Sequence, residues 1–112
     1  MDKKYKKITK EQVLGVLIHI HINFMNPTDV ISVPNIAYIL KTSKYQVRKH
    51  IDVLKKEGLI QVAYFPTSLI DEELSLPIKG FCITEKVEEL EQYKVAEENE
   101  RKIMKEVFWD LI

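Results

Sequence analysis

Cysteine and glycine are scarce in this chain of 112 residues, and the scarcity of each excludes a class of site. Cys82 is the only cysteine, so an intramolecular disulfide and a metal site built from several cysteines are both excluded. We expect its thiol to be buried in a strand. Three glycines in the whole chain leave no room for a glycine-rich phosphate-binding loop.

The chain also lacks an apolar run of the roughly 18 residues that a membrane-spanning helix needs. Its densest apolar segment, residues 13–25, is shorter and includes two histidines and an asparagine. No small-residue cleavage site of a signal peptide follows the basic start of the chain. We therefore expect a cytoplasmic protein with no membrane partner.

Groups of residues that would indicate catalysis or metal binding are missing as well. His19 and His21 point ~200° apart on a helix and cannot share one ion, so we expect His19 to be exposed and His21 to lie in the core. The carboxylates at 71–73 and 88–91 have no nucleophile or histidine placed beside them by the sequence pattern. The sequence therefore predicts no enzyme, no metal site and no cofactor.

Charge is what the chain does have, and it is unevenly distributed although its formal net value is zero. Residues 1–60 hold 11 Lys and Arg against 5 Asp and Glu, and the remainder of the chain is acidic by the same margin. A basic first half favours a polyanionic partner. The plainer interpretation is that the protein has solvated faces of different charge and no such partner.

The hydrophobic pattern predicts a mainly helical chain with one small β-hairpin, which is an α+β fold. Thr9 and Gln12 form a capping-box signature, and Ser43 is placed to cap the helix that carries most of the basic residues. The predicted elements are helices at about 10–24, 34–41 and 43–57, strands at 59–65 and 81–84, and a helical tail that begins at Thr84.

Residues 36–60, "IAYILKTSKYQVRKHIDVLKKEGLI", resemble the helix-turn-helix of winged-helix transcription regulators, and "KGFCITEKVEEL" at 79–90 resembles the return strand of the wing and the helix after it. Ala37 stands where that family has a small residue between its two helices, whereas Lys41 replaces a common turn glycine. The layout is similar to the multiple-antibiotic-resistance and phenolic-acid-decarboxylase types of regulator. The resemblance implies a winged helix-turn-helix with an added C-terminal helix, and binding to double-stranded DNA.

On this interpretation the chain divides into three parts. Residues 1–8 are expected to form a basic arm, residues 9–86 the winged helix-turn-helix domain, and residues 87–112 a helical dimerisation segment. Because helix 10–24 is apolar around most of its circumference, we expect it to be covered on more than one side, by the C-terminal helix or by a second chain.

Helical periodicity places polar side chains of the 43–57 helix on one exposed face, and its N-terminal half is the part that enters the major groove in helix-turn-helix proteins. The side chains expected to contact bases are Tyr45, Gln46, Arg48 and Lys49. Those expected to contact phosphates are Lys41, Ser43, Lys44 and the arm residues Lys3, Lys4, Lys6 and Lys7. A solvated helix face without a ligand is the alternative.

An apolar stripe near the end of the chain predicts a further interface. Its members are Ile103, Met104, Val107, Phe108, Leu111 and Ile112. A twofold dimer is the cover that we favour, because two subunits would contact two half-sites about one DNA turn apart. Packing within a monomer remains open, and an effector ligand is unknown.

The function expected from the sequence is therefore that of a dimeric, sequence-specific DNA-binding transcriptional regulator. The alternative is a winged-helix module that binds another protein, or an accessory factor in a replication or mobile-element assembly. Two acidic features favour the protein-binding alternative, since carboxylates repel phosphates. They are Asp52 on the helix expected to face DNA and the acidic residues 71–73 at the hairpin tip.

Overall fold

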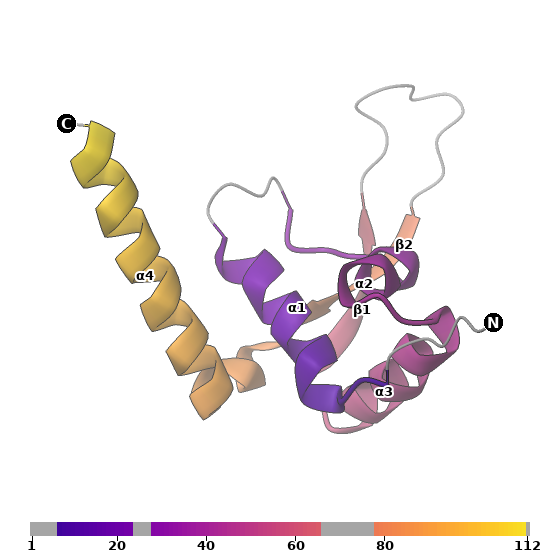
Figure 1. The fold of residues 1–112 in the computed structure, drawn as a ribbon. Coiled ribbons are helices and arrows are strands. Elements are labelled where there is room, and N and C mark those ends of the chain that lie inside the picture. The colour runs from indigo at the N-terminus through magenta and orange to yellow at the C-terminus, as the bar shows by residue number, and fades with distance from the viewer. Residues whose placement is uncertain (1–6, 24–27, 66–77, 112) are drawn as a thin grey trace, which may run out of the picture.

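The computed structural model describes residues 7–23, 28–65 and 78–111, with the side chains of Phe65, Ile78 and 108–111 left out of the description. Four α-helices and a two-stranded antiparallel sheet lie in this part of the chain, so the α+β class is confirmed (Figure 1). In chain order the elements are α1 (Lys10–Ile22), α2 (Val33–Leu40), α3 (Lys44–Lys56), β1 (Ile60–Phe65), β2 (Ile78–Ile83), the 3-10 helix η1 (Glu85–Glu89) and α4 (Glu91–Leu111).

Helix α1 is the central element of the molecule and packs against α2, α3, α4 and β2. The predicted capping box starts it: the Thr9 hydroxyl accepts from the Gln12 N–H at 3.2 Å, and the Thr9 N–H donates to the Gln12 side chain at 2.9 Å. The helix ends at Ile22, two residues earlier than expected, because the backbone of Asn23 is extended. Its position explains why its apolar residues surround it, since neighbours cover several sides.

A tight turn joins α2 to α3. Lys41 takes up the left-handed conformation, with φ 54° and ψ 50°, at the position where the resembled family has a glycine. The Ser43 hydroxyl then accepts from the Gln46 N–H at 3.2 Å and so caps α3. Gly58, with φ 77°, ends the helical segment on the other side, in a conformation that glycine adopts readily.

The hairpin pairs Ile60 with Ile83 at its base and Phe65 with Ile78 at its described end. Residue 31 adds a third short segment through an antiparallel bridge to Phe81, with hydrogen bonds of 3.1 and 2.9 Å. Gly80 makes this approach possible, because a Cβ there would lie 2.7 Å from the Val30 side chain and 2.8 Å from the Ile31 carbonyl oxygen. The sheet is thereby tied to the segment that leads into α2.

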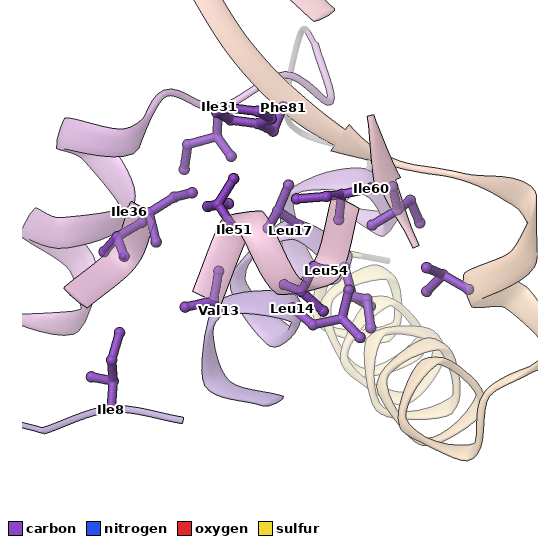
Figure 2. Close-up of a cluster of buried hydrophobic side chains, with 14 of the residues drawn as sticks. Ile8, Val13, Leu14, Leu17, Ile31, Ile36, Ile51, Leu54, Ile60 and Phe81 are labelled. Atoms are coloured by element: carbon purple, nitrogen blue, oxygen red, sulfur yellow. The ribbon is translucent and has the colours of Figure 1, made fainter. Parts of the chain in front are cut away.

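The core lies between α1, α2, α3 and the base of the hairpin (Figure 2). Fully buried side chains come from each helix of this group, namely Val13, Leu17, Ile18, Ile36, Val47, Ile51 and Leu54. The Cys82 thiol is buried in β2, as predicted, and burial raises its pKa. A thiol with a raised pKa forms little thiolate, which makes Cys82 a packing residue.

The predicted helical tail from Thr84 is wrong in one respect, because it is divided in two. Thr84 donates its hydroxyl to the Gly58 carbonyl at 2.6 Å, η1 follows, and Leu90 is extended before α4 begins at Glu91. Leu90 packs against the core, and this contact accounts for the break. Gln92 then donates to the Glu11 carbonyl at 2.7 Å and fixes the start of α4 to the start of α1.

His21 was expected in the core and lies instead at its edge, where 33% of its side chain is exposed, so that prediction is wrong. Its Nδ1 is 3.2 Å from an oxygen of Asp29, which lies in the segment leading back toward the sheet. The helical wheel places His21 below Leu14 and Leu17, but its ring lies 6.4 Å from that of Tyr93 on α4, at the border of a cleft. No helix within the described ranges combines the length and apolarity needed to cross a membrane.

Candidate nucleic-acid interface

Helix α3 has a buried face and an exposed cationic face. Val47, Ile51 and Leu54 are buried and fix the rotation of the helix about its axis. Tyr45, which is 71% exposed, and Lys49 therefore lie on the solvent side, one helical turn apart. This face offers a phenol and an ammonium group to any ligand that approaches α3 from solvent.

The other two predicted base contacts differ from each other. Arg48 is exposed and lies on the flank of α3 that faces β2, where it lines a cleft. Gln46 is half-buried, and its backbone N–H is engaged by the Ser43 cap. The structure thus brings Tyr45, Arg48 and Lys49 to the surface of the first half of α3 and leaves Gln46 partly covered beside them.

The predicted phosphate contacts within the described residues surround the start of α3. Lys44 is its first residue and is exposed, and Lys41 is exposed in the turn before it. The Ser43 hydroxyl is half-buried and already accepts one hydrogen bond. Lys3, Lys4 and Lys6 lie outside the described residues.

The segment before α1 passes along the flank of α3 and places Lys7 there. Ile8 is buried in the core, and its carbonyl oxygen lies 3.1 Å from Nε2 of His50 on α3. Lys7, the neighbouring residue, is exposed. A ligand bound to α3 would therefore have the Lys7 side chain nearby.

An ion pair holds the start of α1 to the end of α3. The Lys10 ammonium lies 2.9 Å from a carboxylate oxygen of Glu57, and this hydrogen bond is the main cause that raises the pKa of Lys10. Because Lys10 and Glu57 neutralise each other, the remaining charges on the exposed side of α3 are one carboxylate, Asp52, and five cations, Lys44, Arg48, Lys49, Lys55 and Lys56.

A cleft of ≈ 360 Å³ separates α3 from β2 and the start of α2. Its cationic residues are Arg48, Lys55 and Lys79, and Asp52 is the carboxylate in its lining. Lys79 comes from β2, and its Nζ lies 5.8 Å from the centre of the Phe81 ring, a cation–π distance. The cleft and the exposed face of α3 form one continuous surface, because Arg48 and Asp52 border both.

Sequence reasoning missed Lys55 and Lys79 as parts of this surface. Lys55 was detectable, since it lies seven residues after Arg48 and so shares its side of the helix. Lys79 reaches the cleft because β2 pairs with residue 31, in the segment before α2, and no local pattern shows this pairing. Tyr38 on α2 is 84% exposed and does not line this cleft.

The apolar stripe of α4 is only partly covered within the chain. Ile103 is 53% and Val107 46% exposed, while Met104 is half-buried and lines a cleft of ≈ 270 Å³ beside His21 and Tyr93. The side chains of Phe108, Leu111 and Ile112 lie outside the described part of the chain.

Over the described ranges, no three potential ligands among His, Cys, Asp and Glu gather closely enough to hold a metal ion.

Comparison with known proteins gives no relative from which a function could be carried over. No protein-family model, no curated protein and no solved structure matches this chain. The functional argument therefore depends on the geometry of α3 and its surroundings.

Proposed function

We propose that this chain is a winged helix-turn-helix protein that binds double-stranded DNA as a cytoplasmic transcriptional regulator. In this proposal α2 and α3 are the helix-turn-helix, and β1 and β2 are the wing. The first half of α3 enters the major groove, where Tyr45, Gln46, Arg48 and Lys49 contact base edges. Lys41, Ser43, Lys44 and the arm lysines Lys3, Lys4, Lys6 and Lys7 contact phosphates.

The observation that carries the proposal is the cationic exposed half of α3, held in place by a buried apolar half. Val47, Ile51 and Leu54 prevent the helix from rotating, so Tyr45 and Lys49 stay exposed together. The αL turn at Lys41 and the Ser43 cap support the same interpretation, because they fix where the helix N-terminus points. Donors on a rigid helix are what base recognition needs.

Dimerisation through α4 belongs to the same proposal. A helix of 21 residues is ~32 Å long, whereas the 13 residues of α1 span only ~20 Å, so α1 cannot cover all of α4. The exposed Ile103 and Val107 lie in the second half of α4. A second copy would cover them and place two α3 helices on one DNA molecule.

A protein-binding winged-helix module is the second candidate, and α2 favours it. Tyr38 and Ile39 are exposed side by side in the sequence of α2, at 84% and 49%. Exposed aromatic and aliphatic side chains are typical of protein interfaces. Asp52, exposed on α3, also favours a partner that is not a polyanion.

Binding to mixed-sequence duplex DNA at ~50 and ~200 mM salt separates the two candidates. The test compares the wild type with an Arg48→Ala/Lys49→Ala double variant, and with Lys102→Ala/Lys105→Ala on α4 as a control that removes the same charge. A DNA-binding α3 predicts micromolar affinity for the wild type and the control, weakening steeply with salt, and much weaker binding by the Arg48/Lys49 variant.

Circular dichroism checks that all three proteins are folded, and the substituted side chains are exposed, so their loss leaves the core intact. Absence of wild-type binding even at low salt would reject the DNA proposal and direct attention to the protein-binding candidate. Equal binding by all three proteins would show that α3 is not the DNA-binding element.

A further inference from the structure

The cleft between α3 and β2 is cationic, and the DNA contacts proposed above assign no ligand to it. Ile51 and Phe81 form its apolar floor and are 2% and 6% exposed. Three cations and one carboxylate line it, which leaves a formal charge of +2 in a space of ≈ 360 Å³. Its chemistry therefore suits an anionic ligand with some apolar surface.

The spacing of the cations suits an extended anion better than a compact one. Arg48 and Lys55 lie on one side of α3 and are ~10 Å apart along its axis, because they are seven residues apart. A single phosphate cannot contact two cations that are ~10 Å apart, whereas a DNA strand carries one charge at every nucleotide and can contact both. Lys79 approaches from β2, on the opposite side of the cleft.

The surroundings of the cleft also favour a backbone strand over a small molecule. Its charged side chains, Arg48, Asp52, Lys55 and Lys79, are all exposed, so none is a buried polar group that would select a particular small ligand. The cleft also continues into the exposed face of α3 through Arg48. A duplex bound to that face through Arg48 would bring a phosphate strand close to the cleft, because phosphates border both sides of a groove.

We propose that the cleft holds one sugar–phosphate strand of the duplex, with Lys55 and Lys79 as its phosphate contacts from opposite sides. This inference rests on the DNA-binding function proposed above and adds two residues and a second element, β2, to the interface. Contacts of this kind are independent of base sequence. Asp52 opposes them by repulsion and limits non-specific affinity.

The test is the salt dependence of DNA binding by a Lys55→Ala/Lys79→Ala double variant. Each phosphate neutralised by a cation contributes ~0.9 to the slope of log affinity against log salt, so the loss of two contacts reduces that slope by ~1.8. The control is Lys94→Ala/Lys102→Ala, which removes two exposed lysines of α4 and should keep the wild-type slope. Thermal unfolding of each protein checks that the fold is retained.

An Asp52→Asn variant should change DNA affinity in the opposite direction. Removal of the carboxylate should tighten binding to every DNA sequence tested. A Lys55/Lys79 variant that keeps the wild-type slope while wild-type DNA binding is normal would overturn the inference and leave the proposed function intact. If the wild type itself fails to bind duplex DNA, the proposed function fails and the inference fails with it.

Discussion

Gly80 determines how closely two segments of this protein approach each other. Its missing side chain lets β2 meet residues 30 and 31, and the bridge between Ile31 and Phe81 forms at this point. Phe81, the next residue, lies on the floor of the cleft beside α3. A residue without a functional group thus positions the surface to which Lys79 belongs.

Replacement of Gly80 by alanine should therefore destabilise the fold. The added Cβ would lie 2.8 Å from the Ile31 carbonyl oxygen and 3.0 Å from its carbon, which are backbone atoms that move only together with the segment. Overpacking of this kind costs about 1–3 kcal/mol in the free energy of unfolding. Urea unfolding followed by circular dichroism measures that loss.

Gly15 provides the matched control, because the same substitution there should have the opposite sign. It lies within α1, and its added Cβ would meet only the flexible end of Gln92, at 3.4 Å. Alanine is favoured over glycine inside a helix by about 0.5–1 kcal/mol. Equal destabilisation by both substitutions would contradict the interpretation of Gly80.

The sequence predicted individual residues well where a local pattern determines them and poorly where the fold does. Periodicity was sufficient for the buried residues of α3, and the single cysteine is in the predicted strand. Lys79 required the pairing of β2 with residue 31, and the position of His21 required the placement of Tyr93 on α4 beside it. Both depend on contacts between segments that are distant in the sequence.

At the scale of elements, caps explain why the helices begin where they do. The signatures at Thr9 and Ser43 predicted the starts of α1 and α3, and the structure has both side-chain cap bonds. Ser32 is also an N-cap residue, at the start of α2, yet its side chain makes no capping hydrogen bond in this described segment. Pro34 in the first turn of α2 removes one of the backbone donors that would need a cap.

This difference predicts unequal effects of two similar substitutions. Ser43→Ala removes a cap bond of 3.2 Å and should lower the free energy of unfolding by about 1 kcal/mol. Ser32→Ala removes no such bond and should change it by only a few tenths of a kcal/mol. Thermal or urea unfolding of the two variants in parallel measures both losses of stability. A larger loss for Ser32→Ala than for Ser43→Ala would contradict the role assigned to the Ser43 cap.

Longer-range packing accounts for the element that the sequence pattern misplaced. The run of residues from Thr84 is rich in helix-forming residues, which favours one continuous helix. The structure breaks it at Leu90, whose partly buried side chain packs against the core and favours this break over the local helix preference. Helix propensity is a weak prior that tertiary contacts override in this way.

At the scale of the whole molecule, the DNA-facing side and the self-association side are separate in the proposal. The cationic residues gather on α3 and at the cleft, whereas the exposed apolar residues Ile103 and Val107 lie on α4. Figure 1 shows α4 on the opposite side of α1 from α3. Each surface can therefore be altered without disturbing the other.

Substitution of the α4 stripe should then reduce dimerisation while DNA contacts remain. We expect Ile103→Gln/Val107→Gln to shift the protein toward monomer in sedimentation velocity, because burial of the two side chains is worth several kcal/mol per dimer, at about 25 cal/mol per Å². Lys102→Gln/Glu106→Gln changes neighbouring exposed residues without altering the net charge and serves as the control. A wild type that is monomeric at all concentrations would refute the proposed dimer.

The most direct test of the DNA-binding claim is an NMR titration of the isotope-labelled protein with a short mixed-sequence duplex. The proposal predicts that amide signals shift along the exposed side of α3, at Lys41 in the turn before it, and at Lys79 on β2, and that they return as salt is added. Signals of residues 91–100 at the start of α4 should hardly move. Shifts confined to Tyr38 and Ile39 of α2, or no shifts at all, would contradict DNA binding through α3.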